Sequence, residues 1–168
     1  MAEKEEVYSS KISYNGIFSF KDLYKFCHDW LVEETGVSLS EDKYSEKIKG
    51  DSKDITVEWK GTKEMTDYFK MEIKVSFKVS DLKNVEVMQG NVKISTNKGS
   101  VEISVKGTLV RDYEDKFEGS GFKKFLRETY EKYIIHDRVL QYKEKVASSC
   151  DEFLSQTKAY LDLEAKKK

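Results

Sequence analysis

Apolar residues return every seven positions through the last third of the chain and predict one long helix, from about residue 120 to residue 164. No Pro or Gly interrupts this stretch after Gly121. With their apolar neighbours, these positions span an arc of about 160°, much wider than the seam of a coiled coil. The arc favours a helix held in a concave surface over a helix paired with a twin. The repeat consists of Leu126, Tyr133, Leu140, Ala147, Leu154 and Leu161.

A first strand and a short helix are predicted before residue 40. Val7 to Tyr14 alternates between apolar and polar residues, as a strand does. Ser19 is a suitable N-cap, with Asp22 three residues later, and the apolar residues that follow recur at helical spacing. Gly36 supplies the left-handed residue that ends such a helix.

A period of two replaces the helical period after Ser40 and predicts antiparallel strands. The strictest alternation runs from Phe69 to Val79, which places Ile73 in the core and Lys74 in water. Besides a turn at Gly50-Asp51 and a polar loop from Gly61 to about Thr66, three further turns are expected. They are Asp81 to Asn84, Gly90 as either a bulge or a tight turn, and the hairpin loop Asn97-Lys98-Gly99.

Together these elements predict a single α+β domain over residues 1–168, in the order strand, helix, five strands, helix. We expect one curved antiparallel sheet of about six strands that grips the long helix on its concave face. In that arrangement Leu140 lies buried where helix meets sheet. Residues 165–168 form a basic tail.

This order of elements resembles the helix-grip fold of the START and birch-pollen-allergen superfamily. The resemblance covers nearly the whole chain and rests on the order of elements. It implies a curved sheet that wraps the last helix, commonly with a cavity for a hydrophobic ligand between them. Some members of that superfamily instead act as chaperone cofactors or as enzymes on cyclic substrates.

Composition and charge narrow the class of partner. The chain has 168 residues, 36% of them charged, and a net charge of −1, which gives no electrostatic reason to expect nucleic acid or an anionic membrane. The polar N-terminus and the lack of a long apolar run predict no signal peptide and no membrane span. Two cysteines do not make a disulfide framework, and we expect a cytoplasmic protein.

Motifs for catalysis are missing. Two histidines and two cysteines stand at no metal-ligand spacing, and the chain has no glycine loop for phosphates and no dinucleotide fingerprint. No acid–base pair stands out. We therefore expect no metal, no cofactor and no enzymatic activity.

The long helix carries the candidate ligand-facing residues. Thr129, His136 and Lys143 occur seven apart within the arc that should face the sheet, and Tyr133 shares that arc. In one interpretation they project into an internal cavity. In the other, rotation of the helix brings them to the edge of the sheet and to water, where Lys143 extends its ammonium group past apolar neighbours.

The end of the long helix should overhang the sheet, unless the helix bends near His136 to Arg138. An overhang would expose an apolar patch, most simply the interface of a homodimer, unless the short helix covers it through Leu23, Cys27 and Trp30. The candidate interface residues are Phe153, Leu154, Tyr160 and Leu161.

Two functions are therefore compatible with the sequence. One is a carrier or sensor of a small hydrophobic ligand held between sheet and helix. The other is a protein-interaction or scaffold module with a solid core, which the bulky residues expected to face inward favour. The volume of any space beneath the long helix distinguishes the two.

Overall fold

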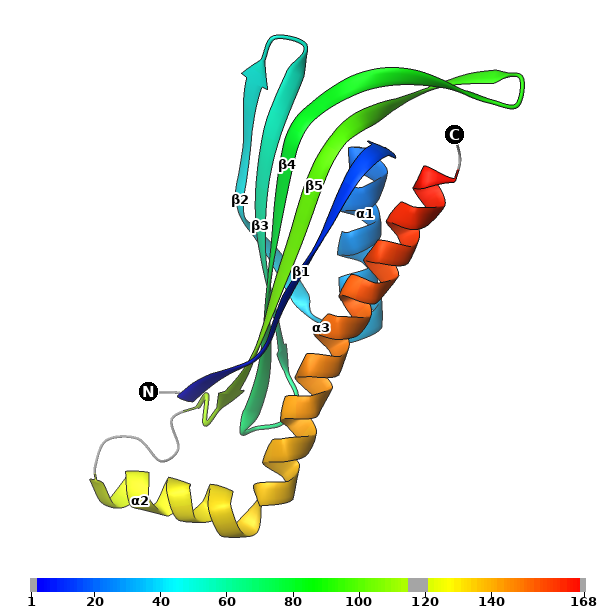
Figure 1. The fold of residues 1–168 in the computed structure, drawn as a ribbon. Helices are drawn as coiled ribbons and strands as arrows, with labels where there is room; N and C mark the ends of the chain where they lie inside the picture. The colour runs from blue at the N-terminus through cyan, green and yellow to red at the C-terminus, as the bar shows by residue number, and fades with distance from the viewer. Residues whose placement is uncertain (1–2, 115–120, 167–168) are drawn as a thin grey trace.

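The computed structural model describes residues 3–114 and 121–166, so the predicted basic tail lies partly outside the described residues. Five antiparallel strands form one open, curved sheet in an α+β fold (Figure 1). Their spatial order is β1-β5-β4-β3-β2, in which every strand except β1 lies beside a sequence neighbour. The strands are β1 (Glu3–Phe18), β2 (Ser38–Lys49), β3 (Ser52–Glu64), β4 (Phe69–Gln89) and β5 (Val92–Arg111).

Two helical regions accompany the sheet. The first is α1 (Phe20–Trp30), followed by the π-helical turn η1 (Leu31–Thr35). Its N-cap is confirmed, because the Ser19 hydroxyl accepts a hydrogen bond from the Asp22 amide at 3.3 Å, and Gly36 ends it with φ of 77°. The second comprises α2 (Gly121–Thr129), η2 (Tyr130–Ile134) and α3 (His136–Ala165). None of the described helices is long and apolar enough to cross a membrane.

The expectation of six strands was wrong, because two predicted turns lie inside long strands. Asp81, with φ of 54°, marks a bulge at a register shift between Ser80 and Lys83, so β4 bends there and continues to Gln89. The chain reverses instead at Gly90, with φ of 65°. Gly99 lies within β5, where a Cβ would come within 3.0 Å of the Leu82 Cα across the bulge. This glycine allows close backbone approach and does not form a hairpin loop.

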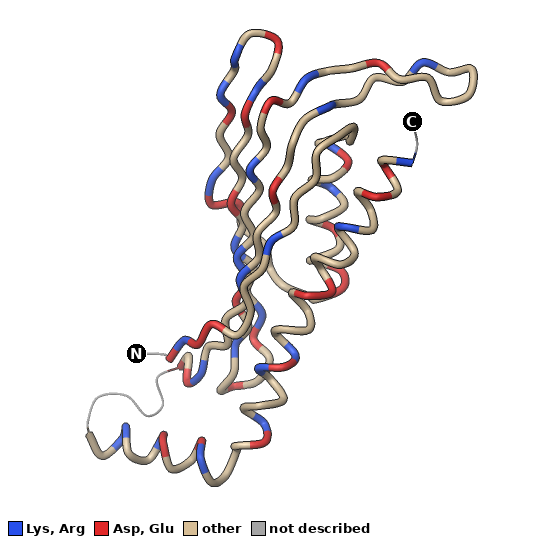
Figure 2. The backbone as a smooth tube through the Cα atoms, viewed as in Figure 1, with Lys and Arg blue, Asp and Glu red and all other residues tan. Residues whose placement is uncertain are grey.

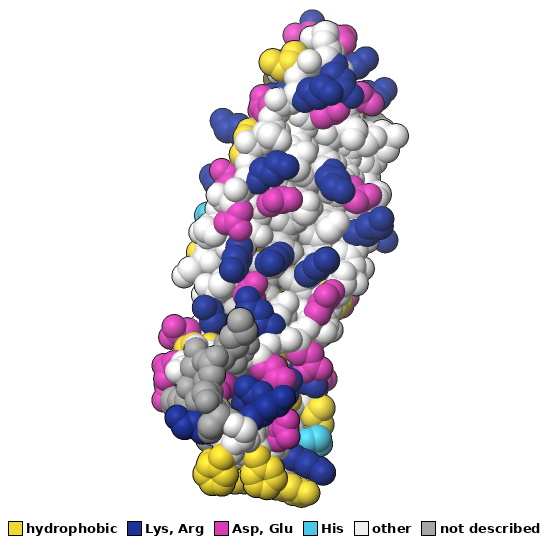
Figure 3. Space-filling view, turned by 90° about the vertical axis from the view of Figure 1, so that its left-hand side faces the viewer, with side chains coloured by type: hydrophobic (Ala, Val, Ile, Leu, Met, Phe, Trp, Pro, Cys, Tyr) yellow, Lys and Arg dark blue, Asp and Glu magenta, His cyan; other side chains and the backbone are white. Residues whose placement is uncertain are grey.

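The core lies between one face of the sheet and the pair α1 and α3. Figure 1 shows both helices on that face, and α3 packs on β1, β5 and α1. Ile73 is fully buried there, as predicted, whereas the side chain of Lys74 is 64% exposed. Charged residues recur along the strands (Figure 2), and many of them gather on the face turned to the viewer in Figure 3.

The long helix is broken at Ile135, which has φ of −120° and ψ of 18°. The Ile135 amide donates to the Tyr130 carbonyl, five residues back, at 3.0 Å, the pattern of a π-helical turn. The α2 segment therefore points away from the line of α3 (Figure 1). The prediction that Leu140 is buried was wrong, since it is 50% exposed, and Val139 and Val146 take the inward positions.

The four candidate interface residues are covered, fully or in part, by other residues of the same chain. Phe153, Leu154 and Leu161 are buried, and the partly buried Tyr160 stacks on Phe26 of α1 with ring centroids 4.5 Å apart. Trp30 contacts Phe153 with ring centroids 5.8 Å apart. The short helix α1 thus covers this end of α3, which is the alternative that the sequence left open, and these four side chains form no exposed patch among the described residues.

Candidate binding groove at the helix elbow

The break in the long helix leaves a hollow of about 440 Å³ between the sheet and the two helical arms. We call it the elbow groove. One wall comes from the β3–β4 loop and the start of β4, and the other comes from η2, Ile135 and the first turns of α3. Its lining residues are Thr66, Asp67, Tyr68, Phe69, Tyr130, Ile135, Arg138 and Tyr142.

Aromatic rings dominate the lining of the elbow groove. Tyr68 meets Phe69 and Tyr130 edge to face, with ring centroids 5.1 Å and 5.6 Å apart. Phe69 in turn lies against Tyr142 at 4.7 Å. Such contacts favour flat apolar ligands, because a further ring can stack or pack edge-on against the same wall.

The β3–β4 loop is held in place by hydrogen bonds around Thr66. The Thr66 hydroxyl accepts from the amides of Tyr68 and Phe69 at 3.1 Å and 2.9 Å. The Tyr113 hydroxyl donates to the Thr66 carbonyl oxygen at 2.6 Å. These bonds hold the backbone of the loop at Tyr68 and Phe69.

A network of charged side chains joins the helix elbow to the sheet. The buried Tyr68 donates its hydroxyl proton to Glu131 Oε1 at 2.7 Å, and Arg111 Nη1 lies 3.5 Å from Glu131 Oε2. Arg111 Nη2 and Lys143 Nζ both approach Glu5 Oε2, at 3.4 Å and 3.0 Å. Burial and the hydrogen bond to Glu131 raise the pKa of Tyr68, so the phenol stays a neutral donor at physiological pH.

Arg138 brings a positive charge to an otherwise mostly apolar hollow, with Asp67 also in the lining. A guanidinium group presents several donors in one plane and suits carboxylate, sulfonate or phosphate groups. The arrangement can therefore hold a ligand with a flat apolar body and an anionic group.

Deeper in the domain the space is filled, because Trp59 meets Phe77 at 4.9 Å between ring centroids and Phe153 is fully buried.

The residues proposed from sequence to face a ligand do not line this groove. Tyr133 is 72% exposed and His136 is also exposed, whereas Thr129 is half-buried on α2. Lys143 pairs with Glu5 at the edge of the sheet. The break at Ile135 turns Thr129 and Tyr133, which precede it, away from the sheet. On α3 the inward positions belong to Val139 and Val146, which leaves His136 and Lys143 outside the groove.

Tyr68, Arg138 and Tyr142 were missed as site residues by reasoning from sequence. Tyr130 and Tyr142 fit the helical pattern as ordinary core positions. The sequence features that could have indicated this site are local ones. A polar loop, Thr66-Asp67, runs directly into two aromatic residues, and the β-branched pair Ile134-Ile135 interrupts helical preference.

Comparisons with known proteins give one partial similarity. No family model and no solved structure matches the chain. Protein SEY1 of Candida glabrata is 26% identical over 122 residues, which is 71% of this chain and 16% of that protein. The chain therefore corresponds to a small part of this relative.

This similarity contradicts the expectation that the chain has no enzymatic activity. SEY1 is a dynamin-like GTPase, so the matched segment belongs to an enzyme. The sequence contains no glycine loop for nucleotide phosphates, and that observation led to the wrong expectation. A chain can share part of an enzyme's sequence without carrying such a motif.

Proposed function

We propose that the domain binds a small hydrophobic ligand that carries an anionic group, in the elbow groove. The observation that carries the proposal is the 440 Å³ hollow with aromatic walls and Arg138 in its lining. Its size falls within the range of small-molecule sites, which are mostly apolar with a few polar groups that orient the ligand.

The order and packing of the elements support a relation to the helix-grip fold. Strand, helix, a four-strand meander and a long final helix follow one another, and α3 lies against the sheet. The proposed groove lies between sheet and long helix, where that superfamily commonly holds ligands. The filled space around Trp59 and Phe153 restricts the site to the elbow.

A matched pair of fluorescent probes tests the proposal. Both 8-anilino-1-naphthalenesulfonate and N-phenyl-1-naphthylamine have the same apolar body, but only the first is anionic. Tyr142→Ala should lower the affinity for both probes, because it removes part of the aromatic wall. Arg138→Gln should lower the affinity for the sulfonate probe about tenfold and leave the affinity for the neutral probe unchanged.

Two controls make the result specific. The double variant Ile48→Ser, Met88→Ser removes two exposed apolar side chains far from the groove and should leave the affinity of both probes unchanged. Thermal unfolding of each variant, followed by circular dichroism, shows that the fold is retained. Failure of both probes to bind, or equal loss of both on Arg138→Gln, would overturn the proposal.

A further inference from the structure

The α2 segment lies on the domain with its polar side inward. Arg127 Nη2 lies 3.2 Å from Glu3 Oε2 on β1, and one turn later Glu131 meets Tyr68 and Arg111. The side chain of Arg127 is only 11% exposed. An amphipathic helix on a globular protein normally turns its apolar stripe to the core, so this packing is the reverse of the usual one.

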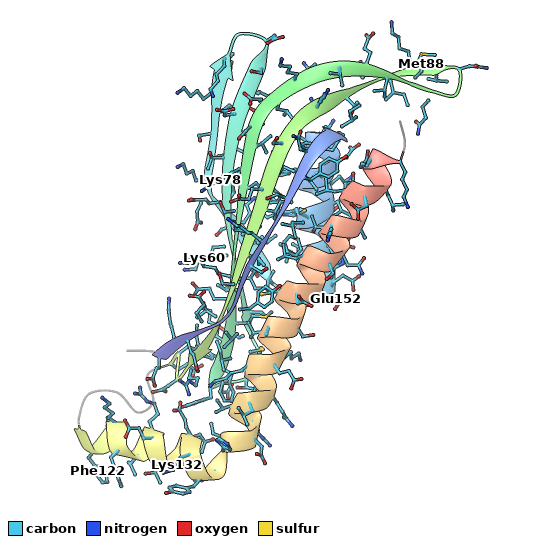
Figure 4. All side chains as sticks on the ribbon, viewed as in Figure 1. Lys60, Lys78, Met88, Phe122, Lys132 and Glu152 are labelled. Atoms are coloured by element: carbon cyan, nitrogen blue, oxygen red, sulfur yellow. The ribbon has the colours of Figure 1, made fainter. Side chains whose placement is uncertain are left out.

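The apolar side of the same segment faces water. Figure 3 shows hydrophobic side chains gathered at the lower end of the domain, and Figure 4 shows Phe122 on the side of α2 away from the sheet. We call this cluster the apolar tip. Its members and their exposed fractions are Phe122 (70%), Phe125 (61%), Leu126 (38%), Tyr133 (72%) and Ile134 (69%).

Basic residues flank the apolar tip. Residues 121–138 contain five basic and three acidic side chains, whereas the whole chain has a net charge of −1. Lys124, Lys132 and Arg138 are exposed, and Lys132 Nζ lies 5.2 Å from the centre of the Tyr133 ring. The net charge of the whole chain is close to zero, but this segment places a positive charge beside exposed aromatic rings.

We propose that the apolar tip docks onto the surface of a lipid bilayer that contains anionic lipids. Amphipathic segments of this composition bury their apolar side about 5–10 Å into the headgroup region, and nearby Lys and Arg attract anionic headgroups. Aromatic rings with adjacent cations suit that interface. The tip lies at one end of an elongated domain, where it reaches a flat surface without obstruction from the sheet (Figure 1).

The size of the tip favours lipid over a second copy of the chain. Five partly exposed side chains offer about 500 Å² of apolar surface, so a twofold contact would bury about 1,000 Å² in total, below the usual range of stable interfaces. A lipid surface needs no matching partner of fixed shape. The elbow groove lies at the same end of the domain, because Tyr130 and Ile135 line it. The proposal stands on the tip alone and does not depend on a ligand in that groove.

Flotation with lipid vesicles tests the proposal. Vesicles of phosphatidylcholine with about 30% phosphatidylserine should carry the chain upward in a density gradient, and pure phosphatidylcholine vesicles should carry much less. Phe122→Ser with Phe125→Ser should lower the bound fraction at least about tenfold, because it removes the two rings that insert. Lys124→Glu with Lys132→Glu should have a similar effect, and so should about 1 M salt, which shortens the Debye length.

A matched control lies at the far end of the molecule. Ile48→Ser with Met88→Ser also removes two exposed apolar side chains, 76% and 57% exposed, but away from the tip, and should leave flotation unchanged. Equal binding to neutral and anionic vesicles, no binding to either, or loss of binding in this control would overturn the proposal. Light scattering that shows a dimer dispersed by the Phe122 and Phe125 substitutions would also overturn it, in favour of self-association.

Discussion

Gly107 on β5 lies directly beneath Cys150 on α3. A Cβ added at Gly107 would come within 2.7 Å of Cys150 Sγ and 3.0 Å of Val146 Cγ1. The missing side chain therefore lets the long helix lie close to the backbone of β5, the strand next to the edge strand β1. Gly107 pairs with Tyr8 on one side and Ile73 on the other, so the backbone has little freedom to yield.

Gly107→Ala should lower the free energy of unfolding by about 1–3 kcal/mol, because the added methyl group overpacks the contact between helix and sheet. Adding Cys150→Ala should recover part of this loss, since it removes the closest atom. Gly121→Ala is the control, because no described residue has an atom within 4 Å of a Cβ there. Urea denaturation measures all three. An unchanged stability for Gly107→Ala would mean that α3 does not sit this close to β5.

The same substitution, Leu→Ala, can be compared at a buried and at an exposed position of α3, at Leu161 and at Leu140. Leu161 is 2% exposed and Leu140 is 50% exposed. Leu161→Ala should therefore cost about 2–5 kcal/mol, and Leu140→Ala about 1 kcal/mol or less. Urea denaturation of both variants measures the difference. Similar losses in the two variants would place Leu140 in the core, as the helical pattern of the sequence predicted.

Much of the fold could be predicted, because its signals are local. The alternation from Phe69 to Val79 fixes which face of β4 is buried, and Ser19 and Gly36 mark the ends of the first helical region. The strand count failed at Asp81, where turn residues form a bulge in a continuous strand. Whether such residues reverse a chain or bend it depends on the partner strand, in this case on the close approach at Gly99.

The elbow groove could not be predicted from the helical pattern. The heptad pattern continues past the break, no Pro or Gly marks it, and the β-branched pair Ile134-Ile135 is only a weak signal, so a bend near His136 to Arg138 remained one of two alternatives. The break is held by contacts distant in sequence, such as Tyr68 with Glu131 and Glu3 with Arg127. Such hydrogen bonds and ion pairs between distant residues have no sequence period, so reasoning from spacing alone could not find them.

The two buried thiols should make the free energy of unfolding depend on pH. Burial raises the pKa of Cys27 and of Cys150 from 9.0 to about 12. Above pH 9 the unfolded chain loses these protons while the folded chain keeps them, so the free energy of unfolding should fall as pH rises from 9 towards 12. This contribution is fully present below pH 9.

Urea denaturation at several pH values measures the slope. The double variant Cys27→Ala, Cys150→Ala should show a shallower fall over this range, because only tyrosines and lysines such as Lys49, whose pKa the Asp54 carboxylate raises, still contribute. In the folded wild type, a thiol reagent at pH 8 should react far more slowly than in urea. Rapid labelling of the folded chain would show that the thiols are open to water.

The Tyr68 hydroxyl and the Glu131 carboxylate should stabilise the elbow as a coupled pair. Their hydrogen bond is 2.7 Å long, and the two side chains are largely shielded from water. A double-mutant cycle with Tyr68→Phe and Glu131→Gln should give a coupling energy of about 1.5–3 kcal/mol, as for buried hydrogen bonds to charged groups.

The edge strand β2 contains a matched pair for that cycle. Tyr44 donates to Glu46 Oε1 at 2.8 Å, but Tyr44 is 46% exposed and water competes for both groups. The cycle with Tyr44→Phe and Glu46→Gln should give a coupling energy of about 0.5 kcal/mol or less. Both cycles use the same chemical changes, so the difference between them isolates the effect of burial. Equal coupling in the two cycles would mean that the bond between Tyr68 and Glu131 is open to water and does not hold the elbow.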